Sequence, residues 1–113
     1  MEKRGILSVL LEFSMFPTSD ECRDGSSVSS QVAKIVDAID KSGIPYQLTP
    51  MGTIIEAKSM KEALNVIELA YEQLSDCERV YSSLKFDIRK NCENRLKTKI
   101  ESVEKVLNRE VNH

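Results

Sequence analysis

The sequence of 113 residues is poor in the residues that build catalytic and metal sites. Its single histidine, His113, is the final residue, so we expect no His-based catalytic dyad in a rigid site. Its three cysteines, Cys22, Cys77 and Cys92, are odd in number, widely spaced and without a Cys-x-x-Cys pair. This pattern predicts neither a disulfide framework nor a zinc site. We therefore expect three reduced thiols and no metal or cofactor.

Long apolar runs and an excess of positive charge are also missing. No stretch approaches the roughly 20 apolar residues of a membrane span, and the first residues do not resemble a signal peptide. The formal net charge of −2 gives no electrostatic reason to bind a phosphate backbone. The expected strand faces offer only Tyr81 for base stacking, which disfavours an RNA-recognition domain. These absences predict a cytoplasmic protein with neither a membrane nor a nucleic-acid partner.

Alternating and helical apolar patterns account for most of the chain, which fits one globular domain over residues 1–113. Period-two alternation and flanking turn residues predict strands over residues 5–16, 44–48, 53–57 and 79–90. Apolar residues at spacings of three and four predict helices from Ser27 or Ser29 to Gly43, from a capping box at residues 59–62 to Leu74, and over residues 96–107. The small and acidic residues 18–24 predict a mobile loop before the first helix.

A break in the middle of the chain separates the two short strands. Pro50 lacks an N–H and biases Thr49 away from helical geometry, while Gly52 can adopt the positive φ of a tight turn. The segment Pro50-Met51-Gly52 therefore predicts a hairpin or a sharply bent strand.

The order of elements is β-α-β-β-α-β followed by a helix, which is the α+β, ferredoxin-like plan. Right-handed crossovers place the third and fourth strands on either side of the first, with both central helices on one face of the sheet. Parity then assigns to the opposite face Ser8, Leu10, Glu12, Ser14, Ile54, Glu56, Ser83, Lys85, Asp87 and Arg89. This face is either an ordinary solvated surface with ion pairs or, because Leu10 and Ile54 lie among the charges, a surface partly removed from water.

Three blocks of the sequence resemble a known family. They are Gly-Ser-Ser-Val-Ser at residues 25–29 with Val32-Ala33, Tyr-Gln-Leu-Thr-Pro-Met-Gly-Thr-Ile-Ile-Glu at residues 46–56, and Arg79-Val80 leading to Lys-Phe-Asp-Ile-Arg at residues 85–89. Together they resemble the thiamine-binding, YkoF-like family of small ferredoxin-like proteins. The resemblance implies a cytoplasmic homo-oligomer, typically a tetramer, that binds thiamine or its hydroxymethylpyrimidine part and has no established catalytic activity. The chain departs from the family at Ala57, where Gly is usual, and in its longer and more acidic loop at residues 18–24.

The same resemblance and the parity of the strands suggest a ligand site. An aminopyrimidine needs a carboxylate, hydroxyl or backbone groups, and an apolar or sulfur-bearing wall. We expect Glu56, Thr49, Thr53 and Ser29 to contact the pyrimidine, and Glu12 or Asp87 to supply a second negative charge. Arg89 is expected to pair with Asp87, and Ser27, Met51 and Gly52 complete the predicted site.

The sequence favours a non-catalytic small-molecule binding protein. Glu12 and Glu56 could act as acid and base, but no signature of glycoside or phosphoryl chemistry accompanies them. The alternatives are an oligomeric structural or interaction protein and a regulatory amino-acid-binding module of the same topology. Leu10, Ile54 and the apolar stripe at residues 96–107 exceed what so small a domain can cover, which predicts a homodimer at least and, by the resemblance, a tetramer.

Overall fold

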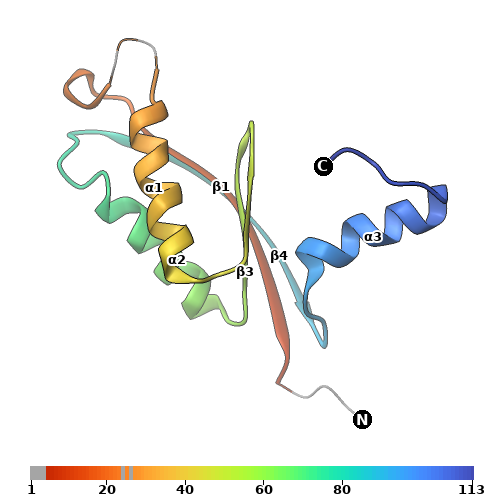
Figure 1. Cartoon of the computed structure of the whole chain (residues 1–113). Helices are drawn as coiled ribbons and strands as arrows, with labels where there is room; N and C mark the ends of the chain where they lie inside the picture. Colours follow the sequence, from red (N-terminus) through yellow and green to blue (C-terminus); the bar gives the residue numbers. More distant parts are fainter. Residues whose placement is uncertain (1–4, 24, 26) are drawn as a thin grey trace.

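Alternating strands and amphipathic helices build a four-stranded antiparallel sheet with two helices packed on one face (Figure 1). The computed structural model describes residues 5–23, 25 and 27–113. Its elements are β1 (Leu7–Pro17), a 3-10 helix η1 (Asp20–Cys22), α1 (Ser29–Ser42), β2 (Tyr46–Thr49), β3 (Gly52–Ala57), α2 (Met60–Glu72), β4 (Val80–Lys90) and α3 (Arg95–Leu107). The predicted ferredoxin-like order with an added C-terminal helix is therefore confirmed. Asp24 and Ser26, which belong to the predicted loop and to the first of the three sequence blocks, lie outside the described residues.

The strands lie side by side in the order β2-β3-β1-β4, with β1 in the centre. Val9 of β1 stands opposite Ala57 of β3 and Ile88 of β4, and this register continues along both ladders. Alternate side chains of β1 face α1 and α2 because successive residues of a strand point to opposite faces. The predicted division of residues between the two faces is confirmed. The buried core comprises Val9, Leu11, Phe13, Met15, Ile35, Ile39, Ile55, Ala57, Ala63, Val66, Ala70 and Leu74.

The helix ends follow local chemistry. Gly43 has φ of 81°, a left-handed conformation that suits glycine, and it ends α1 as predicted. Ser59 caps α2, since its hydroxyl oxygen accepts the N–H of Glu62 at 3.0 Å. At the start of α1 the prediction needs correction: Val28 occupies the N-cap position without a side-chain hydrogen bond, and Ser29 is already helical.

The Pro50-Met51 segment forms the two-residue loop of a hairpin between β2 and β3, in which Thr49 pairs with Gly52. The expected reason for glycine at this position is wrong, because Gly52 does not have a positive φ. A Cβ atom at Gly52 would instead lie 2.7 Å from the carbonyl oxygen of Phe13 on β1. Glycine is therefore required by the close approach of two strands.

A disulfide bond joins Cys22 to Cys77, which overturns the prediction of three reduced thiols. The two Cα atoms are 5.8 Å apart although 55 residues separate the cysteines in sequence. The crossover topology brings η1 beside the turn that follows α2, and sequence spacing does not reveal this proximity. Cys92 is a free thiol.

Further contacts fix the same loop. The carboxylate of Glu21 accepts the N–H of Glu78 at 2.8 Å, and the hydroxyl of Ser19 accepts the N–H of Arg79 at 3.2 Å. The described part of the predicted mobile loop is thus anchored to the start of β4.

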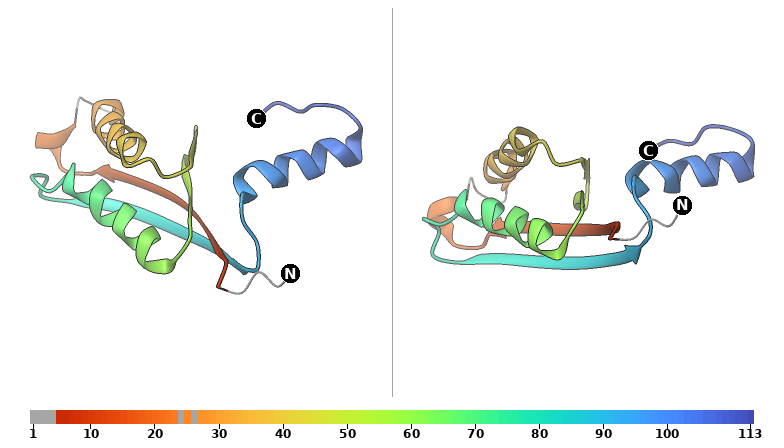
Figure 2. Two further views of the ribbon diagram at one scale, coloured as in Figure 1. Left: turned by 60° about the horizontal axis from the view of Figure 1, so that its bottom comes forward. Right: turned by 90° about the horizontal axis from the view of Figure 1, so that it is seen from below.

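The C-terminal helix projects away from the rest of the chain (Figures 1 and 2). Only the start of α3 lies beside the strands, and the Cα radius of gyration is 16.0 Å. A compact domain of this length would have a radius near 13 Å. The expected dry face of β4 is also partly open, with Leu84 and Ile88 exposed, because this edge strand receives little cover from α1 and α2. Within the described residues, no helix is long and apolar enough to cross a membrane.

Candidate functional site

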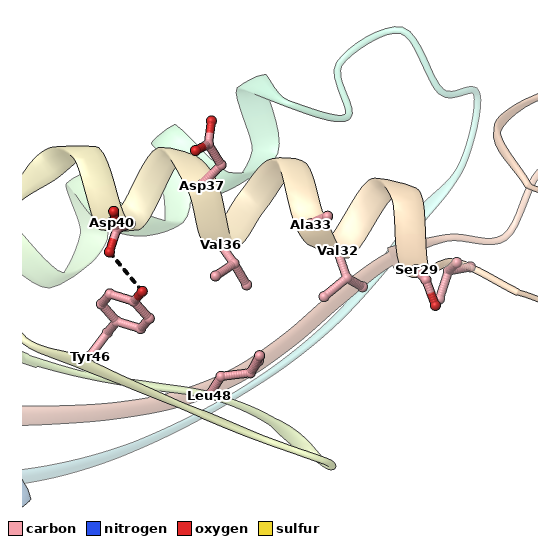
Figure 3. Close-up of a pocket in the computed structure, with 9 residues that line it drawn as sticks. Ser29, Val32, Ala33, Val36, Asp37, Asp40, Tyr46 and Leu48 are labelled. Carbon is pink, nitrogen blue, oxygen red and sulfur yellow. Dashed lines mark hydrogen bonds between the residues drawn. The ribbon is translucent and has the colours of Figure 1, made fainter.

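An open groove lies between α1 and the β2–β3 hairpin, on the helix-covered side of the sheet (Figure 3). Val32, Val36 and Asp40 lie four residues apart on α1 and therefore share one side of the helix. Tyr46 and Leu48 lie two residues apart on β2 and face this side of the helix. The groove, here called the α1 groove, has a volume of about 690 Å³. It is lined by Val28, Ser29, Val32, Ala33, Val36, Asp37, Asp40, Tyr46 and Leu48.

A second hollow, the hairpin pocket, adjoins the α1 groove at the tip of the β2–β3 hairpin. It has a volume of about 370 Å³ and shares Val32 and Leu48 with the groove. Its lining is Phe13, Ser14, Met15, Phe16, Val32, Ile35, Leu48, Thr49, Pro50, Met51, Gly52 and Thr53. The shared residues make the two spaces one elongated, largely apolar surface with a few polar groups, which is the usual character of a small-molecule site.

Thr53 is the buried hydroxyl residue of the hairpin pocket. Its side chain is 5% exposed and stands opposite the core residue Phe13 of β1. No described residue forms a hydrogen bond with the Thr53 hydroxyl. Among the described residues, the side-chain atom that is fully buried without a partner is Oε1 of Gln31, so the Thr53 oxygen itself keeps some accessible surface. The Thr53 hydroxyl is therefore available to a ligand.

The hydroxyl of Thr49 is already engaged, in contrast to that of Thr53. It donates a hydrogen bond to the carbonyl oxygen of Gly52 at 2.8 Å and accepts the N–H of Met51 at 3.3 Å. These bonds fix the loop of the hairpin. Thr49 therefore shapes the pocket, and one lone pair of its oxygen stays free for a ligand.

Two serines mark the end of the α1 groove nearest the start of the helix. The hydroxyl of Ser27 donates to the Ser29 hydroxyl at 3.2 Å and accepts the N–H of Ser29 at 3.3 Å. Ser29 lines the groove (Figure 3), whereas Ser27 does not, and the two hydrogen bonds of Ser27 hold Ser29 at the start of α1. Both side chains are exposed.

The opposite end of the α1 groove is acidic. The hydroxyl of Tyr46 donates a hydrogen bond to Oδ1 of Asp40 at 2.8 Å. This hydrogen bond, burial, and the negative charge of Asp40 all raise the pKa of Tyr46, so the hydroxyl keeps its proton. Asp37 lies nearby but forms an exposed ion pair with Lys41 at 2.7 Å.

The other face of the sheet holds a carboxylate at the start of α3. Glu56 accepts the Ser8 hydroxyl at 2.6 Å, the N–H of Arg95 at 3.0 Å and the N–H of Leu96 at 3.1 Å. A negative charge is favourable at a helix N-terminus. Burial would raise the pKa of Glu56, but these three hydrogen bonds and the charge of Arg95 outweigh burial and lower it.

Arg95 is the buried cation of this face, with 3% of its side chain exposed. It contacts the Asp87 carboxylate at 3.0 Å, and it also donates to the hydroxyl and carbonyl oxygens of Ser8 and to the carbonyl of Asp87. Lys99 donates to the same carboxylate at 3.0 Å. Hydrogen bonds from Lys99 and Arg95, followed by their charges, outweigh burial and lower the pKa of Asp87. The network attaches the first turn of α3 to the sheet.

The structure divides the predicted site between the two faces of the sheet. The groove and pocket contain Ser29, Thr49, Met51, Gly52 and Thr53, whereas Glu12, Glu56, Asp87 and Arg89 lie on the opposite face. Thr53 and Glu56 are three residues apart on β3, and an odd spacing places two side chains on opposite faces. The structure therefore does not bring these two side chains together, and the same separation from Thr53 applies to Glu12 and Asp87.

Two further parts of the predicted site are reassigned. Arg89 was expected to hold Asp87, but Arg95 and Lys99 hold this carboxylate. Glu12 instead forms an exposed ion pair with Lys85 at 3.5 Å.

Sequence reasoning missed Asp40, Tyr46 and Arg95. Asp40 continues the spacing of four that Val28, Val32 and Val36 begin, so the pattern did contain a signal for it. Tyr46 and Leu48 are two residues apart on β2, so alternation along the strand predicts that both side chains face the same side as each other. Arg95 carries no such signal, because its position depends on the turn after β4, where Asn91 and Asn94 have positive φ values of 59° and 57°.

Sequence comparisons place the chain among known relatives. A family model described as "Thiamine-binding protein" matches residues 11–104. A UPF0045 protein of Methanothermobacter thermautotrophicus is 35% identical over 84 residues, which cover 73% of this chain and 85% of the relative. A UPF0045 protein of Bacillus subtilis is 32% identical over 101 residues, covering 87% of this chain and 96% of the relative.

Solved structures share the fold. A hypothetical protein of Methanocaldococcus jannaschii superposes with a TM-score of 0.70 at 33% identity, covering 85% of this chain and 95% of that one. A candidate thiamine biosynthesis/salvage protein of Thermotoga maritima superposes with a TM-score of 0.58 at 20% identity, covering 81% of this chain and 96% of that one. The second likeness concerns the fold alone.

Proposed function

The chain belongs to the thiamine-binding protein family, and from this premise we propose that the α1 groove and the hairpin pocket together bind thiamine or its hydroxymethylpyrimidine part. The observation that carries the proposal is the hydroxyl of the buried residue Thr53, which lines the hairpin pocket and forms no hydrogen bond with a described residue. The Thermotoga maritima neighbour is described as a candidate thiamine biosynthesis/salvage protein, which agrees with this ligand class.

The pocket suits a flat aminopyrimidine. Such a ring presents an amino donor beside ring-nitrogen acceptors, and one hydroxyl can both donate and accept. Thr53 supplies this hydroxyl, beside Leu48 of the paired strand. Val32 and Leu48 form the apolar walls, and the exposed Met51 side chain stands at the hairpin tip. Ser29 provides a further hydroxyl along the groove.

Binding without catalysis is the activity that these residues support. A nucleophilic mechanism needs a nucleophile within hydrogen-bond reach of a base. Among the described residues that line the groove and the pocket, no serine or threonine hydroxyl is hydrogen-bonded to a histidine, a lysine or a carboxylate. The Tyr46 hydroxyl does donate to Asp40, but this contact raises the pKa of Tyr46 and so opposes formation of a reactive phenolate. His113 lines two hollows beside α3, one of which also includes Tyr46, but it does not line the α1 groove or the hairpin pocket.

The site residues on the opposite face receive a structural role in this proposal. The Glu56 carboxylate accepts the first N–H groups of α3, and the Asp87 carboxylate forms an ion pair with Arg95. They hold α3 in place and do not contact the ligand of the α1 groove.

Self-association is part of the proposed function. Leu10, which was expected to need a partner, is already buried within the chain. The exposed apolar residues lie elsewhere, at Leu84 and Ile88 on β4 and at Val103 and Val106 on α3. These residues and the projecting α3 support a homodimer at least, with a tetramer as the larger assembly.

The location in the cytoplasm stays a prediction. Disulfides persist in oxidising compartments and are rare in the cytosol of most organisms, so the Cys22–Cys77 bond argues against it. Thiol labelling of the protein in intact cells, read by mass spectrometry, would test both points at once. Labelling of all three cysteines would support the cytoplasmic prediction.

Calorimetric titration with thiamine and with hydroxymethylpyrimidine tests the ligand. Thr53→Val replaces the unpartnered hydroxyl by a methyl group of similar size, so the fold should keep its stability. Loss of one hydrogen bond should weaken binding about two- to twelvefold. Thr98→Val, at an exposed position on α3, is the matched control and should bind as the parent does.

Two results would contradict the proposal. Absence of binding of both compounds at millimolar concentration would favour the structural or regulatory alternatives. Parent-like binding by a folded Thr53→Val variant would remove the hairpin pocket from the site.

A further inference from the structure

The α1 groove has two chemically different ends. Figure 3 shows Ser29 near one end and the Asp40–Tyr46 pair at the other, with Val32 and Val36 directed toward Leu48 between them. Eleven residues separate Ser29 from Asp40, which corresponds to about 16 Å along a helix that rises 1.5 Å per residue. The groove can therefore receive an elongated ligand in one preferred direction.

The charges of the groove have a single sign. Among the described residues that line it, the ionisable carboxylates are Asp37 and Asp40, and no lysine or arginine joins them. Asp37 is neutralised by Lys41 at 2.7 Å. Asp40 accepts a hydrogen bond from the neutral Tyr46 hydroxyl and forms no ion pair with a described residue. Asp40 thus keeps a negative charge at this end that no direct ion pair with a described residue neutralises, although Lys41 interacts with it electrostatically.

Tyr46 adds an aromatic ring to this charge. The ring is half-buried on β2 and is held through its hydroxyl by Asp40. A cation is attracted to the face of an aromatic ring, and a carboxylate beside the ring adds a direct charge interaction. The pair is suited to a positively charged heterocycle.

The polar groups at the opposite end need a different partner. The buried residue Thr53 lines the adjoining hairpin pocket, and its hydroxyl has no hydrogen bond with a described residue. It can accept and donate hydrogen bonds but carries no charge, so it suits a neutral ring with donors and acceptors. This hydroxyl is an observation independent of the acidic end.

Resting on the proposed function, we infer that Asp40 and Tyr46 are specificity residues that recognise a positively charged ring, so that the site binds a cationic two-ring ligand in preference to its neutral half. The neutral aminopyrimidine lies at Thr53, and the cationic ring lies against Tyr46 beside the Asp40 carboxylate. Intact thiamine has this pattern, since its thiazolium ring carries the positive charge, whereas hydroxymethylpyrimidine is neutral.

A neutral analogue isolates the charge. Calorimetry compares thiamine with 3-deazathiamine, in which a thiophene replaces the thiazolium and the shape is kept. The parent should bind thiamine about two- to fivefold more tightly than the analogue, as expected for one charge interaction at a partly exposed site. This preference should shrink as salt is added, because exposed charges are screened.

Asp40→Asn removes the negative charge and keeps a side-chain oxygen that can accept the hydrogen bond from the Tyr46 hydroxyl. The variant should lose the preference for thiamine over 3-deazathiamine. Asp76→Asn, at an exposed position after α2, removes the same charge away from the groove and should keep the preference. Thermal unfolding of each variant confirms that the fold is unchanged.

The outcomes separate the two proposals. If the parent binds none of the three compounds, the proposed function fails. If the parent binds thiamine and 3-deazathiamine equally, or if Asp40→Asn weakens both by the same factor, the ligand site stands and the inference about the acidic end is overturned. Because the comparison of the two compounds uses the parent protein, it decides the question even if Asp40→Asn does not fold.

Discussion

Glu56 illustrates how one carboxylate can hold a helix against a sheet. It accepts one hydroxyl and two backbone N–H groups, and the latter two belong to the first residues of α3. Deleting the acceptor of a charge-assisted hydrogen bond typically costs about 1.5 to 3 kcal/mol. We therefore expect Glu56→Gln to lower the free energy of unfolding by this amount, measured by urea denaturation at pH 7. Binding in the α1 groove should change little, since the two sites lie on opposite faces.

The control for this variant is Glu101→Gln. Glu101 forms an exposed pair with Lys97 at 3.7 Å, and such pairs contribute about 0 to 1 kcal/mol. Parent-like stability of Glu56→Gln, or a large loss of ligand affinity with an intact fold, would contradict the structural role of Glu56.

The dependence of stability on pH gives a second test of the hydrogen bonds that Glu56 and Asp87 accept. Because the folded protein lowers the pKa of Glu56 and of Asp87, their ionised forms are the ones that it stabilises. This stability is fully present above the unfolded-state pKa values near 4 and is lost as the pH falls through the lower folded-state values. The melting temperature should therefore fall between pH 5 and pH 2, and Glu56→Gln should show a shallower fall.

Single residues also show where sequence reasoning succeeds. Alternation along β1 and β3 predicts the faces of Glu12, Thr53 and Glu56 correctly, because the period of a strand is fixed by its backbone. The grouping of Thr53 with Glu56 failed because it required a kink to override this period. The hairpin is regular from Thr49 to Gly52, so no such reorientation occurs.

At the scale of elements, the Cys22–Cys77 disulfide ties η1 to the turn after α2. A cross-link stabilises mainly by restricting the unfolded chain, and removal of a native disulfide typically costs about 2 to 4 kcal/mol. We expect Cys22→Ser, or reduction of the parent, to lower the free energy of unfolding by this amount in denaturant titrations. Cys92→Ser is the matched control, because Cys92 is a free thiol, and it should unfold as the parent does.

A thiol titration accompanies this measurement. The unfolded, unreduced parent should show one reactive thiol, and three after reduction. Three thiols without reduction, together with parent-like stability of Cys22→Ser, would show that the bond is not formed in solution.

Element order and type were predictable from the sequence, while contacts between distant elements were not. Local features such as helix periodicity, the Ser59 cap and the Gly43 end are determined by residues close together in sequence, so the sequence predicts them. The disulfide and the α3 attachment depend on how crossovers bring segments together, for which a single sequence contains no direct signal. The close approach of Gly52 to Phe13 belongs to this second class as well.

At the scale of the whole molecule, α3 projects from the sheet and exposes apolar side chains. Val103 is half-exposed and Val106 is 85% exposed on α3, and burying such side chains contributes about 1.5 kcal/mol or more each. The parent should therefore sediment as a dimer or larger species at tens of micromolar. The double variant Val103→Glu and Val106→Glu should weaken association by at least about tenfold.

Lys105→Glu is the control, since it changes the charge of α3 at an exposed polar position between these valines. It should leave association unaltered. A parent that sediments as a monomer of 12.8 kDa would contradict the proposed assembly.

The alternation of β3 makes the length of this strand more important than its composition. Thr53 and Glu56 serve opposite faces, and Gly52 fits β3 against Phe13 at the point where the strand begins. Insertion of one residue between Gly52 and Glu56 would turn the remainder of the strand over, so that Glu56 entered the core and Ile55 faced outward. A substitution in β3 affects one face of the sheet at a time, whereas a single-residue insertion or deletion would disrupt the ligand pocket and the α3 attachment together. Natural variation in this segment should therefore proceed by exchange of side chains at constant length.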